Sequence, residues 1–166
     1  MKLNRMLESE LDKFNKINIE ELTSMYSLKM SENEAKEKAQ SEQYELLSEG
    51  VNTKDHFLYT IKTDSDKKVG SIWFGKMERD SKDIAFIFYI RIDNDKRGRG
   101  FGKSAIKMIE EEIKKIGIDT IRLHVLKDNI TANKMYKNLG YNIFKDFDGY
   151  KEENLGEVLE KKLKGT

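Results

Sequence analysis

The sequence predicts a mixed α/β fold in which helices cover both faces of a sheet. Hydrophobic periodicity divides the chain into three parts. Helical patterns fill roughly the first fifty residues, three strand patterns with short connections follow, and strands and helices then alternate to the end. A chain with this order of elements forms a mixed sheet with helices on both of its faces.

Length and composition indicate one ordinary globular domain over residues 1–166. Apolar and charged residues each make up 37% of the chain, and 31 Lys and Arg residues stand against 30 Asp and Glu residues, so the net charge selects no partner. The absence of cysteine excludes disulfides and cysteine-ligated metal sites, and the 2 histidines lie too far apart in sequence for a His-rich site. We therefore predict no metal.

We expect neither a secretory signal nor a membrane helix in this sequence. Its N-terminus, "MKLNRMLESELDKF", has a charge every few residues and no apolar core of a signal peptide. The longest uncharged apolar run, "IAFIFYI", is far shorter than the roughly 20 residues that a membrane helix needs. We expect a cytoplasmic protein without a membrane partner.

The first fifty residues predict two helices. Ser9 with Asp12 and Ser31 with Glu34 have the spacing of a capping box, and Gly50 is positioned to end the second helix. The second helix is rich in acidic residues, which we interpret as a solvated face. These residues are Glu32, Glu34, Glu37, Glu42 and Glu45.

Three strands follow, over residues 56–63, 69–77 and 84–92. Each has the alternation or the apolar run of a strand, and the connections "DSDKK" and "ERDSKD" are short and turn-like. Strands joined by such short connections form an antiparallel meander.

A long amphipathic helix is predicted to begin at Phe101 and to stop at Gly117. Its apolar residues fall on one face, and the pairs Glu110–Lys114 and Glu111–Lys115 are expected on the outside. Beyond it we predict a strand over 120–126, a short helix over 130–140, and two final strands over 141–147 and 157–163.

The segment "KRGRGFGKS", residues 96–104, joins the third strand to this helix without a capping side chain. Glycines let the backbone approach a ligand closely, and free amides at the positive end of a helix dipole attract anions. With four cationic side chains in the same segment, the pattern predicts a phosphate site, above all one for a pyrophosphate. The alternative is a glycine-rich turn with solvated charges.

Other glycine motifs fail here by one residue. Arg97 stands where a P-loop needs its first glycine, Lys103 stands where a dinucleotide fingerprint needs its third, and Ile106 stands where a hydrolase elbow needs its last. "RGRG" is too short for an RNA-binding tract, so we expect no nucleic acid.

The loop instead matches a family motif, because Arg97-x-x-Gly100-x-Gly102 has the form [QR]-x-x-G-x-[GA] of the GNAT superfamily of acyl-CoA-dependent N-acetyltransferases. The chain also resembles this superfamily in the segment N-x-x-A-x-x-x-Y-x-x-x-G-[FY], one helix and one strand later. The residues in register with this second motif are Asn129, Ala132, Tyr136, Gly140 and Tyr141.

The resemblance covers essentially the whole chain, and it implies a single GNAT domain. Its sheet would have seven strands, mostly antiparallel, and would splay between the strand ending near Ile92 and the one ending near Leu126. The resulting groove would bind acetyl-CoA as cosubstrate. Family habit also suggests a homodimer.

Carried over by position, the family motifs assign the site residues. The pantetheine arm would pair with the backbone of Ile90, Arg91 and Ile92, Asn129 and Asn133 would lie near the pantetheine or thioester, and Tyr136 would donate a proton to the leaving thiolate. Residues of the loop and the helix start would hold the pyrophosphate: Arg97, Gly98, Arg99, Gly100, Phe101, Gly102, Lys103 and Ser104.

Several of these residues also have a purely structural interpretation. Tyr136 can be a core aromatic residue, and Asn129 can simply cap the helix that begins near Ile130. We interpret His56 and His124 as structural.

The function that follows from the resemblance is acetyl transfer from acetyl-CoA to a primary amine of an unidentified acceptor, by direct attack in a ternary complex. Many relatives have a carboxylate in the third strand, whereas here Tyr89 and Arg91 occupy the corresponding positions. The general base therefore stays unassigned, with a water relay as the working hypothesis. An acyl-CoA-binding module with little transferase activity is the alternative.

Overall fold

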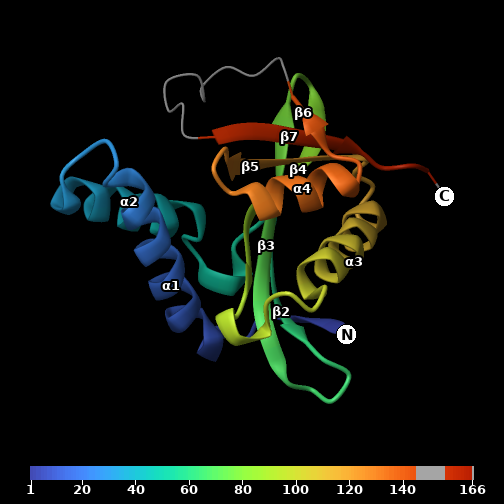
Figure 1. Ribbon diagram of the computed structural model, residues 1–166, viewed down its shortest axis with the longest axis horizontal. Helices are drawn as coiled ribbons and strands as arrows, with labels where there is room; N and C mark the ends of the chain where they lie inside the picture. Colours follow the sequence, from blue (N-terminus) through green and yellow to red (C-terminus); the bar gives the residue numbers. More distant parts are fainter. Residues whose placement is uncertain (145–155, 166) are drawn as a thin grey trace.

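The computed structural model describes residues 1–144 and 156–165, and it contains a seven-stranded sheet in the order β1-β2-β3-β4-β5-β7-β6 (Figure 1). The strands are β1 (Lys2–Arg5), β2 (His56–Lys62), β3 (Lys68–Arg79), β4 (Lys82–Ile92), β5 (Thr120–Leu126), β6 (Asn142–Ile143) and β7 (Gly156–Lys162). The helices are α1 (Glu8–Tyr26), α2 (Glu32–Leu46), α3 (Phe101–Lys115) and α4 (Ile130–Asn138), with two short 3-10 helices, Gly50–Asn52 and Asn94–Lys96.

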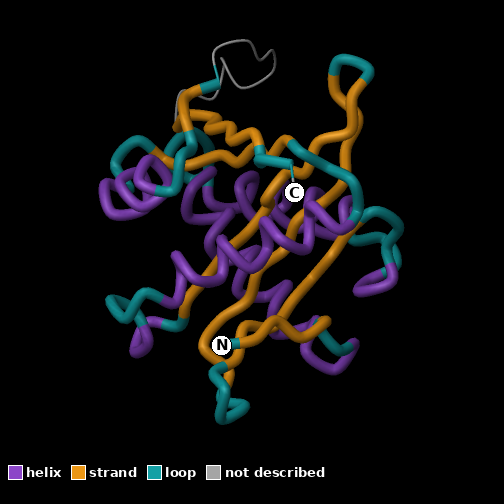
Figure 2. Tube along the Cα trace, turned by 90° about the vertical axis from the view of Figure 1, so that its right-hand side faces the viewer, coloured by secondary structure: helices purple, strands orange, loops and turns teal. Residues whose placement is uncertain are grey.

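The antiparallel meander is confirmed, since β2 pairs with β3 and β3 with β4, both antiparallel. The β3–β4 hairpin is long, and its turn projects beyond the rest of the sheet (Figure 2). Two residues with left-handed backbone, Asp80 (φ 54°) and Ser81 (φ 62°), form that turn, as expected for the tight turns that fit twisted strands.

The sheet splays at its centre, as predicted. Strands β4 and β5 are parallel and pair only over Ala85–Ile87 and Ile121–Leu123, although β4 continues to Ile92 and β5 to Leu126. The edge of β4 beyond Ile87 therefore faces β5 without strand pairing, which leaves backbone groups for another partner.

A β-bulge in β4 lies directly beside this opening. Trp73 of β3 is opposite Tyr89, whereas the next residue, Phe74, is opposite Ile87, so Phe88 is the extra residue. Phe88 and Tyr89 consequently both pack into the cluster under α1, although side chains of consecutive strand residues normally alternate between faces. The bulge also changes which later residues of β4 face α1.

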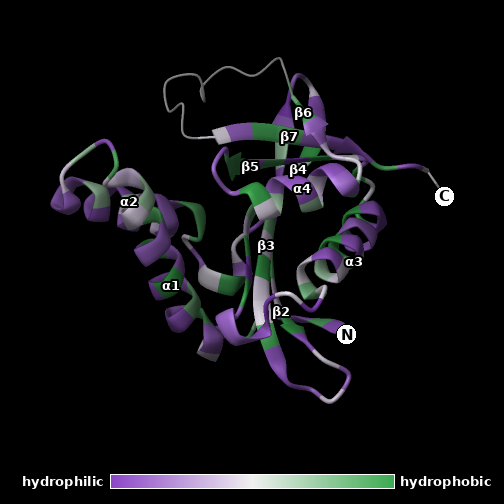
Figure 3. Cartoon of the chain, viewed as in Figure 1, coloured by the Kyte–Doolittle hydropathy of each residue, from purple (hydrophilic) through white to green (hydrophobic). Residues whose placement is uncertain are grey.

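Helices cover both faces of the sheet (Figure 1). On one face, α3 buries Ala105, Ile106, Ile109 and Ile113 in the larger core, to which α4 adds Tyr136. On the other, α1 packs against Trp73 and Leu58. Figure 3 shows the apolar strands enclosed between helices with largely polar outer surfaces. Within the described ranges, no helix is long and apolar enough to cross a membrane.

Three predictions near the N-terminus were wrong. Residues 2–5 form β1, an edge strand paired with β2, and not part of a helix. Helix α1 begins at Glu8, and the Leu7 amide donates to Glu10 Oε2 at 2.8 Å, so Ser9 is not its cap. Helix α2 ends at Leu46, well before Gly50, which begins a 3-10 helix.

Ser31 was predicted correctly as the N-cap of α2, because its hydroxyl accepts from the Glu34 amide at 3.2 Å. Glu110, however, is not on the outside of α3. It is 5% exposed and accepts two bonds from Lys161 of β7, at 2.9 and 2.8 Å. Of the predicted strand over 141–147, Asn142–Ile143 is confirmed, and residues 145–147 lie outside the described residues.

Candidate active site

Two adjoining cavities occupy the opening between β4 and β5. The strand cavity, of about 330 Å³, lies between the splayed strands and is lined by α1, β4, β5 and α4. The loop cavity, of about 670 Å³, lies beside the end of β4 and the glycine loop. Four residues line both cavities, so the two form one continuous site. They are Glu21, Ile90, Asn129 and Ala132.

The glycine loop presents unused backbone amides to the loop cavity. Gly98 (φ 77°) and Gly100 (φ 81°) are left-handed, and Gly100 is the N-cap of α3 without a capping side chain. A Cβ atom at either glycine would meet no atom within 4 Å, so the space in front of this backbone is open. Within the described part of the chain, no group accepts a hydrogen bond from the amides of residues 98–103. The arrangement is that of an anion site.

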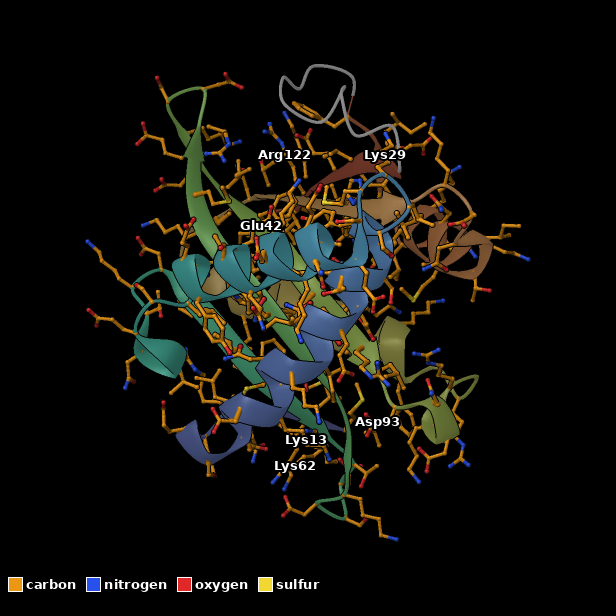
Figure 4. The ribbon with its side chains drawn as sticks, turned by 90° about the vertical axis from the view of Figure 1, so that its left-hand side faces the viewer. Lys13, Lys29, Glu42, Lys62, Asp93 and Arg122 are labelled. Carbon is orange, nitrogen blue, oxygen red and sulfur yellow. The ribbon has the colours of Figure 1, made fainter. Side chains whose placement is uncertain are left out.

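Cationic side chains surround these amides. Lys96, Arg97 and Lys103 line the loop cavity, whereas Arg99 and Ser104 are exposed and do not line either cavity. The Arg97 Nε donates to the Ile92 carbonyl at 3.0 Å, which ties the loop to the end of β4. Asp93 precedes the loop, and it is labelled at the lower right of Figure 4.

The predicted pantetheine strand borders both cavities. Ile90 lines both of them, and Arg91 and Ile92 line the loop cavity. All three residues pair with β3 on one side only, because the pairing of β4 with β5 ends at Ile87. The Ile92 carbonyl already accepts from Arg97, so the unpaired groups of this edge lie nearer to Ile90.

Tyr136 lies on α4 in the wall of the strand cavity and is 5% exposed. Its ring packs edge-on against Tyr141 at 5.5 Å. Burial raises the pKa of the Tyr136 phenol well above its usual value, so the hydroxyl is protonated at neutral pH. A protonated phenol at a cavity wall can act as a proton donor.

The two asparagines of α4 have different surroundings. Asn129 caps α4 by accepting from the Ala132 amide at 3.2 Å, and it also lines both cavities. Asn133 lines neither of them. Its amide donates to the carbonyls of Leu126 and Asn129, both at 2.9 Å, and so fixes the turn between β5 and α4.

Helix α1 brings Glu21 to the site, although no motif in the sequence predicts it. The Arg91 guanidinium of β4 donates to the Glu21 carboxylate, across 70 positions of sequence. The Arg91 Nε and the Tyr89 hydroxyl beside it are buried and have no hydrogen-bond partner among the described residues. The sequence signal for this cavity wall was helical spacing alone, which brings four residues of α1 onto one face. These four residues, Asn18, Glu21, Leu22 and Met25, all line the strand cavity.

Burial, followed by the negative charge of Glu21, raises the pKa of the Tyr89 phenol, and the charge of Arg91 opposes this increase. Tyr89 therefore stays protonated at neutral pH. Its ring packs edge-on against Phe14 of α1 at 5.3 Å, which holds helix and strand together at this point.

His56 is structural, as predicted, because its Nδ1 accepts from Trp73 Nε1 at 3.0 Å. Burial lowers the pKa of His56, against a smaller opposing effect of Asp55. His124 of β5 lines the strand cavity, and Gly156 of β7 allows close approach, since a Cβ there would lie 2.7 Å from His124 Nε2.

The sequence is similar to that of a known protein family and to those of bacterial relatives. The sequence profile of the Acetyltransferase (GNAT) family matches residues 19–141. The uncharacterized N-acetyltransferase YdgE of Bacillus subtilis is 25% identical over 141 residues, which cover 84% of this chain and 90% of YdgE. The uncharacterized N-acetyltransferase YycN of the same organism is 30% identical over 97 residues, or 58% of this chain and 62% of YycN.

Solved structures share the fold. The crystal structure of YycN matches with a TM-score of 0.81 and 22% identity, over 89% of this chain and 96% of that one. The PaiA N-acetyltransferase of Thermoplasma acidophilum, solved in complex with coenzyme A, matches with a TM-score of 0.64 and 20% identity, over 97% of this chain and 98% of that one.

Proposed function

The chain belongs to the GNAT family of acetyltransferases, and from this premise we propose that it transfers an acetyl group from acetyl-CoA to a primary amine. The amine would attack the thioester directly, in a ternary complex. The observation that carries the proposal is the continuity of the two cavities, which leads from the free amides of the glycine loop to the Tyr136 hydroxyl.

The residues present fit coenzyme A. The free amides of residues 98–103, with Lys96, Arg97 and Lys103, would hold the diphosphate, as helix N-termini hold anions. The unpaired edge of β4 near Ile90 would pair with the amides of the pantetheine arm like an added strand. The coenzyme A bound to the PaiA protein supports this assignment through the shared fold.

The remaining roles follow from position. Asn129, at the junction of the two cavities, would contact the pantetheine or thioester region, and Asn133 would keep that turn in place. The protonated Tyr136 would supply the proton to the departing sulfur. Because a thioester is already activated, the larger part of the acceleration would come from orienting the amine, which can contribute about 7 kcal/mol or more.

The experiment that tests the proposal has two readouts. Purified protein is titrated with coenzyme A by calorimetry, and thiol release from acetyl-CoA is then measured with a broad panel of amines, with products identified by mass spectrometry. We expect saturable coenzyme binding and acceleration by at least one class of amine. Coenzyme binding without acceleration by any amine would favour the binding-module alternative, and greater protection against thermal unfolding by ATP than by coenzyme A would contradict both.

A further inference from the structure

Glu21 is the single carboxylate among the described residues that line either cavity. It lies where the two cavities meet, next to the end of the proposed pantetheine strand. Strand β4 itself contributes no acidic side chain to this region, because its wall residues are aromatic, aliphatic or, at Arg91, cationic. The carboxylate that the strand lacks is thus supplied by α1.

We propose that Glu21 is the acceptor-binding carboxylate of this enzyme, which docks the ammonium form of the acceptor amine and takes the proton that the amine must lose. This inference rests on the proposed acetyl transfer and deepens it by naming a residue and a substrate class. The acceptor it implies is a cationic amine that enters between α1 and the splayed strands.

The accessibility of Glu21 fits this role. Its side chain is 46% exposed and that of its partner Arg91 is 23% exposed, so the carboxylate is held on one side and open on the other. A carboxylate has about four lone-pair sites and can accept from a guanidinium and an ammonium at once. Docking an ammonium therefore does not require Glu21 to leave Arg91.

Two features hold Glu21 in place. The first is Arg91, which is fixed on β4 directly after the bulge that turns Phe88 and Tyr89 toward α1. The second is a buried polar contact one turn earlier on α1, where Asn18 donates to Gln43 of α2. Arg91 is therefore a positioning residue, and α1 is anchored on both sides of its cavity-lining stripe.

Glu21 and Tyr136 together account for every proton that moves in the transfer step. The ammonium gives one proton to the Glu21 carboxylate, and the nitrogen lone pair then forms the N–C bond to the thioester carbon. As the C–S bond breaks, sulfur keeps its electron pair and takes the proton of the Tyr136 hydroxyl. The second amine proton returns to Tyr136 through water, and Glu21 releases its proton to solvent. The products are the amide, the free thiol and one proton.

The test compares Glu21→Gln with Glu20→Gln. Glu20 is the preceding residue of α1, is exposed and lines neither cavity, so it is a control for the lost charge. The two probes are ethylamine, which is cationic at pH 7, and 2,2,2-trifluoroethylamine, which has nearly the same shape and is neutral. Thiol release from saturating acetyl-CoA gives kcat/KM for each probe, and the fastest amine of the panel is measured alongside.

We expect Glu21→Gln to lower kcat/KM at least tenfold for ethylamine and for the fastest cationic amine, but less than threefold for the neutral probe. Glu20→Gln should leave all three rates within twofold of wild type. Equal losses for the charged and neutral probes, or no loss in Glu21→Gln, would overturn the proposal.

Arg91 provides an independent readout. Arg91→Lys keeps a cation opposite Glu21 and should retain most of the acceptor affinity, whereas Arg91→Met should raise the acceptor KM several-fold more. A purely structural Arg91 would instead give two variants that differ in unfolding temperature and not in KM.

Coenzyme binding distinguishes a failure of the proposed acetyl transfer from a failure of the proposed role of Glu21. Glu21→Gln should bind coenzyme A as wild type does, because the groups proposed to hold the coenzyme are the loop amides, the cations beside them and the backbone edge of β4. Wild-type protein that binds coenzyme A and is inert to every amine would refute the transferase itself. Wild-type activity that survives fully in Glu21→Gln would refute only the role of Glu21. If cationic amines are turned over but fail to raise the unfolding temperature of the coenzyme-loaded protein, ammonium docking is excluded.

Discussion

The two sides of the joined cavities present different chemical groups, backbone amides on one side and helix side chains on the other. The loop side, residues 96–103 with the start of α3, offers backbone amides, and its open glycines have no side chain to interfere. On the α1 side, the helix contributes the side chains of Asn18, Glu21, Leu22 and Met25, because the backbone groups inside a helix are already hydrogen-bonded to one another. Backbone amides can serve the same diphosphate in every relative, whereas side chains can be exchanged one at a time. The loop side therefore suits an invariant coenzyme, and the α1 side suits an acceptor that differs between proteins.

The largest effect should come from Tyr136 of α4, in the wall of the strand cavity. Replacing Tyr136 with Phe removes the proposed proton donor, and general acid catalysis of this kind typically contributes about 10²-fold or more. We expect kcat to fall by that factor, with coenzyme affinity unchanged. Stability should hold as well, because the hydroxyl makes no hydrogen bond among the described residues.

The matched control is Tyr141→Phe. Tyr141 packs edge-on against Tyr136, its hydroxyl is buried without a partner among the described residues, and it lines neither cavity. Its loss should leave kcat intact and should not lower stability. Full activity in Tyr136→Phe would show that the proton comes from elsewhere.

The next largest effect should come from changing the backbone of the loop side alone. Gly100→Ala places a side chain on a left-handed residue at the start of α3, and Gly117→Ala does the same at its end, where φ is 80° and a Cβ again meets no atom within 4 Å. Both variants should lose about 1–2 kcal/mol of stability from backbone strain.

Only Gly100→Ala should weaken coenzyme A binding, by tenfold or more (about 1.4 kcal/mol), since only there would the strained amides face the proposed diphosphate site. Calorimetric titration gives the affinities and chemical denaturation gives the stabilities. An equal effect of the two alanines on coenzyme affinity would mean that the loop amides do not bind it.

A third effect concerns the side chains that support α1. Gln43 of α2 is 1% exposed, donates to Asn15 Oδ1 at 2.8 Å and accepts from Asn18. Gln43→Leu leaves both partners unsatisfied and should cost about 1–3 kcal/mol of unfolding free energy.

Because Asn18 lines the strand cavity, the acceptor KM should rise in Gln43→Leu while coenzyme affinity stays constant. The exposed residue Gln40 on the same helix gives the control Gln40→Leu, which should change neither quantity. A parallel loss of coenzyme affinity in Gln43→Leu would show that the two sides are not independent.

The same contrast explains what the sequence could predict. The loop motif is contiguous, so the sequence from Arg97 to Gly102 was enough to predict that α3 begins at a glycine loop without a capping side chain. The meander and α3 were also predictable, because periodicity is local to each segment. Even the splay followed from the family resemblance, and β4–β5 pairing over only three positions confirms it.

What the sequence could not give depends on contacts between distant segments. Strand β1 is four residues long and acquires its structure by pairing with β2, some sixty residues later. Glu110 has the surface spacing of a helix ion pair, and only the position of Lys161 on β7 explains why it is buried. Glu21 is one of many acids in the first fifty residues, and its contact with Arg91 distinguishes it. In each case the structure of the residue depends on a partner that is distant in sequence, so local sequence patterns cannot predict it.

The smallest effect is a pH dependence confined to the α1 side. His56 must be neutral at Nδ1 to accept from Trp73, and burial lowers its pKa in the folded state below the ordinary histidine value of 6.5. The unfolded chain therefore binds more protons at mildly acidic pH, so stability is full above about pH 6.5 and falls as the pH drops below it. His56→Gln, whose amide oxygen can accept the same bond without titrating, should show a shallower loss of stability between pH 7 and 5.

Since Trp73 packs with Phe14 of α1, amide hydrogen exchange at pH 5 should accelerate in α1 before it does in α3. Parallel stability curves for wild type and His56→Gln would show that His56 does not cause the acid dependence. Exchange that rises equally in both helices would show that the two sides respond to acid as one unit.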